Sequence, residues 1–226
     1  MAKLNVSVPA IQKAFYPNEQ RSAIRKKLDQ IYSDYAKEIK LVSSITNVPE
    51  KLITSFIFIE SGGNPKVVSS AKAVGLMQLI PTSANDILVI ENQKNRLSDA
   101  EKKVLAEKLG NRFTSGILKM RYLGDMVKVG DGFSSSFVTQ QDLFDPLLNI
   151  LIGSIYLGLL VDEHTEGSSI RLDKVVIRYN RGYFSDNKGK NLVGRVEDIV
   201  ARVPTESKNY VLKLLGVNGT LDSAMA

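Results

Sequence analysis

The chain of 226 residues contains no cysteine and a single histidine. Without cysteine it can form no disulfide, no thiolate zinc site and no cysteine nucleophile. The one histidine, His164, follows an apolar run, stands among acidic residues and has no second histidine nearby. We therefore expect His164 on the surface, and we expect neither a bound metal nor a cofactor.

The sequence also lacks the marks of an export signal and of a membrane span. Residues 1–9 show no basic start, apolar run and small-residue cleavage site. A helix that crosses a bilayer needs about 20 predominantly apolar residues, and we find no such stretch. We therefore expect synthesis in the cytosol, no transmembrane segment and no use of the general secretory route.

Long blocks of like charge are missing as well, although the chain is basic overall. Thirty basic and 24 acidic residues give a net charge of +6. This excess suits an anionic surface such as nucleic acid, anionic lipid or a cell-wall polymer. Because no block of like charges and no RNA-binding aromatic signature accompanies it, no nucleic acid is expected, and nucleic-acid binding is kept as a minor alternative.

Apolar residues at helical spacing dominate what is present, and strand alternation is scarce. Helices are expected over residues 19–45, 52–60, 91–113, 147–161, 172–179 and 206–215, and from about Pro81. Glycine and serine in residues 114–141 predict irregular structure. Asp145 and Pro146 together predict a helix cap and a first-turn proline. The sequence therefore predicts a mainly α protein, with helices 52–60, 147–161 and 172–179 at its centre.

Glu60 lies near the C-terminal end of the expected helix 52–60, on its apolar stripe. Phe56 precedes it by four residues and Ile57 by three, so the carboxylate faces the apolar side. Burial and the negative end of the helix dipole both raise the pKa of such a carboxyl, as a general acid requires. Position alone is equally consistent with a solvated glutamate or one paired with a buried cation.

Four blocks of sequence follow one another along the chain, and Glu60 is the first residue of the first block. They are Glu60–Pro65 with Ser69 and Ala73–Ala84, then Asp145–Leu157, Arg178–Gly182 and Pro204–Val211. In this order they resemble the soluble lytic transglycosylase family. In that family a Glu-Ser pair precedes a serine and Gly-Leu-Met-Gln-x-x-Pro, which matches Gly75 to Pro81 here. The departures are Gly63, where the family usually has a large residue, Lys72 at a common glycine position, Arg181 in place of a small residue and Ser207 in place of threonine.

The resemblance implies a lysozyme-like helical domain of the goose-type and lytic transglycosylase kind. It implies cleavage of the β-1,4 bond between N-acetylmuramic acid and N-acetylglucosamine. Glu60 would act as acid on the glycosidic oxygen and then as base on the muramoyl 6-hydroxyl, leaving a 1,6-anhydro end. This route needs no second carboxylate. No acid is evidently paired with Glu60 in the sequence, although Asp142, Asp145 or Glu206 could approach it in space.

The resemblance also supplies candidate substrate-binding residues. These are Ser69, Gly75, Met77, Gln78, Tyr179, Asn180 and Glu206. Gly75 would admit close backbone approach of the sugar and Met77 would floor its site. Five of these residues also have a simpler structural explanation. Ser69 and Gly75 could form a turn, Met77 and Tyr179 could pack in the core, and Glu206 could serve the first turn of its own helix.

The spacing between Pro81 and Asp145 is longer than in a typical family member, which predicts an insertion within residues 91–141. We assign residues 1–45 to an N-terminal extension with a packing helix, 46–215 to the catalytic domain and 216–226 to a C-terminal tail.

Two alternatives use the same fold: a muramidase that hydrolyses with water, and a non-catalytic wall-binding or virion structural module. The expected partners are peptidoglycan glycan strands. Without an export signal, a wall-cutting enzyme needs another route to the periplasm or cell wall. We therefore hypothesise a phage virion or ejection protein, with other virion or secretion-apparatus proteins as partners.

Overall fold

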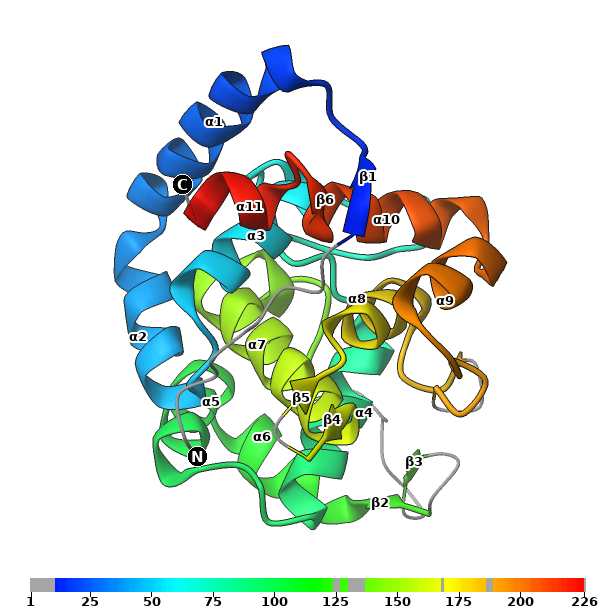
Figure 1. The fold of residues 1–226 in the computed structure, drawn as a ribbon. Helices are drawn as coiled ribbons and strands as arrows, with labels where there is room; N and C mark the ends of the chain where they lie inside the picture. Colours follow the sequence, from blue (N-terminus) through cyan, green and yellow to red (C-terminus); the bar gives the residue numbers. More distant parts are fainter. Residues whose placement is uncertain (1–10, 124–126, 130–136, 168, 186–188, 226) are drawn as a thin grey trace.

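The computed structural model describes residues 11–123, 127–129, 137–167, 169–185 and 189–225. Helices make up most of this part of the chain (Figure 1). They are α1 (Arg21–Asp34), α2 (Ala36–Thr46), α3 (Glu50–Ser61), α4 (Pro81–Gln93), α5 (Asp99–Leu109), α6 (Asn111–Gly116), α7 (Pro146–Glu163), α8 (Leu172–Arg181), α9 (Val196–Arg202), α10 (Thr205–Leu215) and α11 (Thr220–Met225). The predicted mainly α class is therefore confirmed.

The strands among the described residues are short and pair two by two. β2 (Met120–Tyr122) pairs antiparallel with β3 (Val127–Val129), and β4 (Thr165–Glu166) with β5 (Ser169–Ile170). β1 (Ile11–Ala14) pairs in parallel with β6 (Gly216–Val217). This last pair and the packing of α1 against α11 bring the two ends of the described chain together, and α1 also packs against α3.

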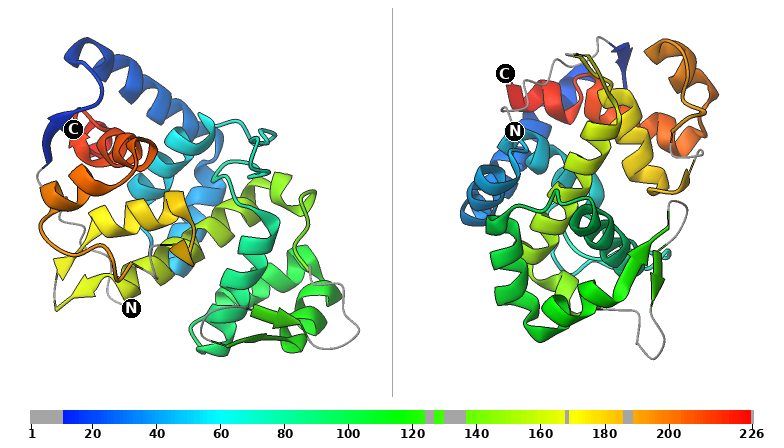
Figure 2. Two further views of the ribbon diagram at one scale, coloured as in Figure 1. Left: turned by 90° about the vertical axis from the view of Figure 1, so that its right-hand side faces the viewer. Right: turned by 90° about the horizontal axis from the view of Figure 1, so that it is seen from below.

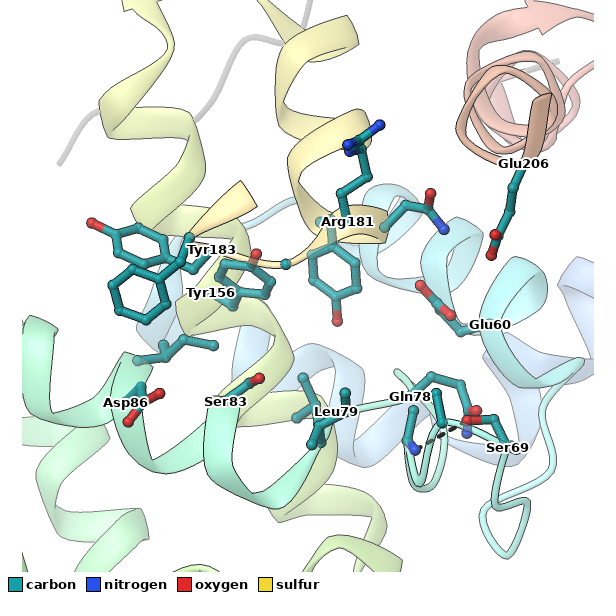
Figure 3. A pocket seen from close by; sticks show the side chains of 18 of the residues that line it. Glu60, Ser69, Gln78, Leu79, Ser83, Asp86, Tyr156, Arg181, Tyr183 and Glu206 are labelled. Carbon is teal, nitrogen blue, oxygen red and sulfur yellow. Dashed lines mark hydrogen bonds between the residues drawn. The ribbon is translucent and has the colours of Figure 1, made fainter. Parts of the chain in front are cut away.

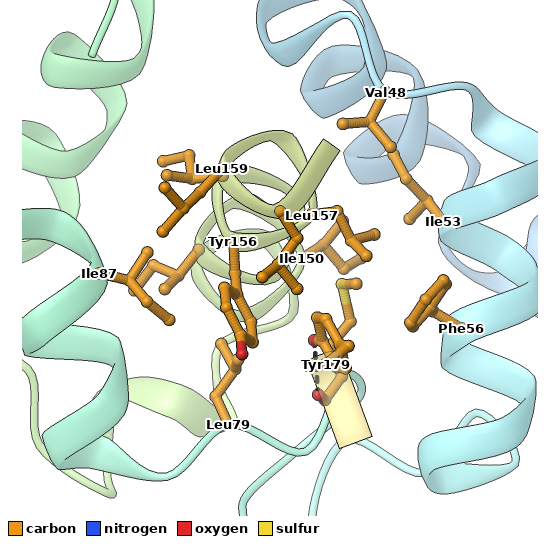
Figure 4. Close-up of a cluster of buried hydrophobic side chains, with 14 of the residues drawn as sticks. Val48, Ile53, Phe56, Leu79, Ile87, Ile150, Tyr156, Leu157, Leu159 and Tyr179 are labelled. Carbon is orange, nitrogen blue, oxygen red and sulfur yellow. Dashed lines mark hydrogen bonds between the residues drawn. The ribbon is translucent and has the colours of Figure 1, made fainter. Parts of the chain in front are cut away.

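Helix α7 runs through the centre of the core, where it packs against α2, α4 and α8 (Figure 4). Asp145 caps it by accepting a hydrogen bond from the Leu148 amide at 2.9 Å, with Pro146 in the first turn, as predicted. By length and mean hydropathy (1.4), α7 could cross a membrane, contrary to our reading of the sequence. Since 72% of this 18-residue segment is buried within the fold, α7 is a core helix.

Two helices that the sequence predicts as continuous are interrupted. Residues 19–45 form α1 and α2, which meet at Tyr35 with φ of −123° and ψ of 22°. In the 91–113 range, α4 first runs on to Gln93, and α5 then begins with a capping box between Ser98 and Glu101. Gly110, with φ of 57°, separates α5 from α6, because this left-handed conformation suits glycine. The sequence analysis did not foresee α9 and α11.

His164 is buried, with 7% of its surface exposed, so the prediction of a surface histidine is wrong. It follows α7 directly, and its Nε2 lies 3.4 Å from Nη1 of the buried Arg178. Gly189 also packs against the ring. Burial, helped by the Arg178 charge, lowers the pKa of His164 to about 4. The acidic neighbours in the sequence gave no sign that α8 and the Gly189 loop would cover this side chain.

Within residues 91–141, where the sequence predicts an insertion, the chain forms α5, α6 and the antiparallel pair β2–β3. Residues 124–126 and 130–136, part of the range expected to be irregular, lie outside the described residues. Figure 2 shows these elements at one end of the molecule, away from β1, β6 and α11. The chain returns to the core at Phe137 and Val138, whose amides donate to Oδ1 of Asn85 at 3.0 Å each. Asn85 lies on α4, so the returning chain is fixed to that helix.

Candidate active site

A groove of about 370 Å³ opens between six segments of the chain (Figure 3). Its lining comes from the end of α3, the loop of residues 69–80, the first turns of α4, Tyr156 of α7, the end of α8 with the residues after it, and the start of α10. These segments come from both halves of the sequence. The groove therefore exists only when the whole core is assembled.

Glu60 points into this groove from the last turn of α3 (Figure 3). Gly62, in the left-handed region with φ of 59°, ends the helix directly behind it. Burial raises the pKa of Glu60 to about 7, although a hydrogen bond from the Tyr210 hydroxyl acts in the opposite direction. A large share of the Glu60 side chains is therefore protonated near neutral pH, while the carboxyl still lines an open groove.

Aromatic rings from α3, α7, α8 and α10 enclose the buried side of this carboxyl. Phe56 lies one turn before Glu60 and meets Tyr179 edge to face at 4.8 Å between ring centroids. Tyr210 packs against the same phenylalanine at 6.2 Å, and Tyr156 lies 4.9 Å from Tyr179. These rings exclude water from behind Glu60, which accounts for the desolvation that raises its pKa.

The loop after α3 brings Ser69 and Gln78 to the groove, beside Glu60 (Figure 3). The hydroxyl of Ser69 accepts a hydrogen bond from the Ala73 amide at 3.0 Å, which makes it a turn-forming residue as well. A hydroxyl that accepts one bond can still donate its proton to a ligand. Gln78, with φ of 47°, donates from Nε2 to the Gly75 carbonyl at 2.9 Å. Its amide therefore also holds the loop closed.

Gly75 and Met77, predicted in the groove, lie beneath it instead. At Gly75, with φ of 75°, an added Cβ would come within 2.5 Å of Nδ2 of Asn149 on α7. Met77 is fully buried, its amide donates to Oδ1 of Asn149 at 2.7 Å, and Asn149 Nδ2 donates to the Val74 carbonyl at 2.9 Å. The loop therefore packs against α7, and Gly75 and Met77 belong to this packing rather than to the groove lining.

Tyr179 and Asn180 reach the groove from the end of α8. The Tyr179 hydroxyl donates to the Met77 carbonyl at 3.0 Å, so its ring rather than its polar end faces the groove. Asn180 accepts a hydrogen bond from the Ser207 hydroxyl at 2.8 Å, which connects α8 to α10. Through these hydrogen bonds, Tyr179 and Asn180 hold the groove walls beside Glu60 in position.

Of the acids named from the sequence as possible companions of Glu60, only Glu206 lines the groove. It is an exposed residue in the first turn of α10, and Figure 3 shows it on the same side of the groove as Glu60. Asp142 instead binds Arg112 at 2.7 Å, which together with Thr139 lowers its pKa to about 2. Asp145 caps α7 and binds Lys108 at 2.7 Å.

Tyr210 and Asp86 are among the residues of this site that the sequence analysis missed. Tyr210 lies four positions after Glu206 in the closing sequence block, so the helical period placed both on one face of α10 and could have identified it. Asp86 lines the other end of the groove, and burial raises its pKa to about 6. Nothing in the sequence separates Asp86 from the other polar residues of α4.

Comparison with known proteins places this site in context. Residues 37–110, from α2 to α5 and including Glu60, match the family model described as Transglycosylase SLT domain. Over 150 residues the chain is 31% identical to Membrane-bound lytic murein transglycosylase E of Buchnera aphidicola subsp. Baizongia pistaciae, covering 65% of this chain and 51% of the relative.

A second match, of 41 residues, is 63% identical to Endo-type membrane-bound lytic murein transglycosylase A of Klebsiella pneumoniae subsp. pneumoniae. It covers 18% of this chain and 20% of the relative. The chain thus spans about half or less of the length of these curated relatives. The resemblance inferred from the motifs is confirmed for residues 37–110.

Proposed function

From the transglycosylase SLT domain in residues 37–110, we propose that this chain is a peptidoglycan lytic transglycosylase with Glu60 as its catalytic acid and base. The observation that carries the proposal is the Glu60 carboxyl itself: it faces an open groove, and burial raises its pKa to about 7. The names of both relatives, which describe lytic murein transglycosylases, support murein as the substrate.

In the first step the protonated Glu60 gives its proton to the oxygen that joins N-acetylmuramic acid to N-acetylglucosamine. The bond from C1 of the muramoyl residue to that oxygen breaks, and Glu60 is left as a carboxylate. The Tyr210 hydroxyl, which donates to this carboxylate, stabilises the charge that develops on it.

In the second step the Glu60 carboxylate takes the proton of the muramoyl 6-hydroxyl. The freed oxygen closes on C1, giving a 1,6-anhydro end and returning Glu60 to its protonated form. No water is consumed. One carboxyl whose pKa lies near the working pH can serve both steps, since it gives and accepts a proton with similar ease.

The remaining groove residues are proposed to hold the strand. Ser69 and Gln78 flank Glu60 from the loop below, and Asn180 and Glu206 flank it from α8 and α10. Their hydroxyl, amide and carboxyl groups suit hydrogen bonds to sugar hydroxyls and acetamido groups, while the Tyr179 ring offers an apolar face.

Product mass tests the proposal. Purified sacculi are digested with the wild-type chain, and the released muropeptides are weighed by mass spectrometry beside a Glu60→Gln digest that measures background. Lytic transglycosylase products lack the mass of one water relative to hydrolytic products. Release of hydrated ends alone would overturn the proposal, as would release equal to the Glu60→Gln background.

Hydrolysis by a muramidase on the same fold is the second candidate, and Glu206 is the observation that favours it. A second carboxylate on the groove wall could orient a water molecule for attack at C1. Under that mechanism the products gain one water, and Glu206→Gln abolishes release. Under the lytic mechanism Glu206→Gln weakens substrate binding and leaves the anhydro product unchanged.

We place the activity in the periplasm or cell wall, where murein lies. Delivery in a phage particle, with other virion proteins as partners, is a separate hypothesis about the route. It predicts that the chain is found in purified particles by mass spectrometry, and its absence from them would contradict that route.

A further inference from the structure

The groove extends well beyond Glu60 and ends at Asp86. Figure 3 shows the two carboxyls at opposite ends of the cavity, with Leu79, Ser83 and Tyr156 between them. Asp86 lies on the second turn of α4, and its side chain is partly buried. It therefore cannot assist Glu60 at the bond being cleaved, and it faces a different part of any bound strand.

Asp86 makes no hydrogen bond or ion pair with the residues that the structure describes, and burial is the single cause that shifts its pKa. Asp142 shows the contrast, because Arg112 and Thr139 surround its carboxylate and lower its pKa. A carboxyl that loses water on folding without gaining a partner costs stability. Where it also lines a groove, the missing partner is expected from a ligand.

The wall opposite Asp86 is aromatic. Tyr183 lies across the groove from it (Figure 3), and the Phe184 ring packs edge to face on Tyr183 at 5.0 Å. The Tyr183 hydroxyl donates to Glu163 at 2.6 Å, which fixes its ring, while Phe184 remains 38% exposed beside the groove. A partly buried carboxylate at the end of a groove, with no ion-pair partner among the described residues, suits an organic cation, which supplies the missing ion pair.

We propose that the Asp86 end of the groove binds a primary ammonium group carried by the murein strand, so that strands bearing such a group are cleaved in preference. The inference rests on the proposed function, since it names a part of the same substrate. Two sources offer this chemistry: a glucosamine whose N-acetyl group has been removed, and the free amino group of a diamino residue in the stem peptide. Because the chain carries a net charge of +6, a preference for cationic strands requires a local carboxylate such as Asp86.

Four substrates separate these sources. One pair is sacculi before and after acetylation of their free amines with acetic anhydride. The other pair is peptide-free glycan strands, fully N-acetylated or partly de-N-acetylated. Initial cleavage rates are measured for wild type, for Asp86→Asn, and for Asp99→Asn, which removes the same charge from an exposed position at the start of α5.

The expected result is a rate ratio, amine-bearing over amine-free, of about ten for wild type and Asp99→Asn in at least one pair. In Asp86→Asn the same ratio falls to near one. A fall confined to the sacculi identifies the stem amine, and a fall confined to the glycan strands identifies the glucosamine amine. Equal ratios in wild type and Asp86→Asn for both pairs would overturn the proposal.

Binding separates failure of this inference from failure of the proposed function. The Glu60→Gln chain, with and without Asp86→Asn, is titrated with the same four polymers, so that no substrate is consumed. If wild type cleaves nothing but Glu60→Gln binds amine-bearing polymer about tenfold more tightly in an Asp86-dependent way, the catalytic proposal fails and the ammonium site stands. If Asp86→Asn leaves these affinities unchanged, the ammonium site fails whatever the cleavage result.

Discussion

The hydroxyl of Tyr210 on α10 donates a hydrogen bond to the carboxylate of Glu60 on α3, 150 residues earlier in the chain. Burial raises the pKa of Glu60, and this hydrogen bond is the interaction that opposes the increase. The balance between burial and this hydrogen bond sets the pH range over which Glu60 can give a proton. Removing the Tyr210 hydroxyl should shift that pH range in a known direction.

Tyr210→Phe is therefore expected to raise the pKa of Glu60 further. Because the proposed mechanism begins with protonated Glu60, the rate is expected to fall as pH rises through the pKa of Glu60, which is about 7 in the wild type. In the variant this falling limb of the profile of kcat/KM against pH moves to higher pH. Tyr32→Phe is the matched control, since Tyr32 donates to Glu50 on another face of α3 and should leave the limb in place. A limb that moves to lower pH in Tyr210→Phe contradicts the assignment.

Glu60→Gln should lower the rate of murein cleavage by about 100- to 10,000-fold, the usual contribution of a general acid and base. The amide keeps the shape of the side chain and can still accept from Tyr210, so the fold is preserved. Cleavage is measured by release of soluble muropeptides. Glu107→Gln, at an exposed position on α5, should retain wild-type activity. Cleavage by Glu60→Gln within threefold of wild type would rule Glu60 out.

The same variant should be more stable than wild type at alkaline pH. In the folded state the pKa of Glu60 is raised, so ionisation works against the fold, and stability falls as pH rises from about 4.5 towards 7. The Glu60→Gln variant has no carboxyl to ionise at this position and so keeps its stability as pH rises. Its free energy of unfolding should exceed that of the wild type by about 3 kcal/mol above pH 7 and by nearly nothing below pH 4.5. Urea unfolding of both proteins at pH 4.5 and pH 8 measures it. A difference that is equal at the two pH values would argue against a buried Glu60.

Asn149→Ala should destabilise the floor of the groove. Its amide satisfies the Met77 amide and the Val74 and Leu143 carbonyls, all at 2.7–2.9 Å, within a fully buried site. Truncation leaves these groups unpaired, at a cost on the order of 3 kcal/mol. Asn64→Ala removes a single hydrogen bond at an exposed turn and should cost less than about 1 kcal/mol. Similar melting temperatures for the two variants would contradict the role of Asn149.

Local signals in the sequence were sufficient for much of the fold. The cap at Asp145, the proline after it and the apolar run beyond located α7, and helical spacing located α3, α8 and α10 within two residues of their observed ends. Each of these signals is contained in a few neighbouring residues. Helical spacing did not reveal the breaks at Tyr35 and Gly110, because apolar residues continue in register across both.

Predictions that depended on distant contacts were less successful. The sequence predicted that Glu60 faces the apolar side of α3, but burial of His164 depends on Arg178 and the loop at Gly189, which no local pattern brings to it. Gly75 and Met77 were assigned to the groove because their motif surrounds Glu60, whereas Asn149, more than 70 residues away, draws that loop onto α7. Asp86 acquires its raised pKa from the surrounding fold alone.

The separation of Glu60 and Tyr210 along the sequence also bears on when, during folding, the pKa of Glu60 is raised. A contact that spans 150 residues cannot form within one helix or one hairpin, because it requires α10 to pack against α3. Until then Glu60 is an ordinary solvated glutamate that stays ionised at neutral pH. A nascent or half-folded chain in which α10 is not yet in place therefore carries Glu60 without its raised pKa, and the acid and base role that we propose for Glu60 arises only once these two helices have packed together.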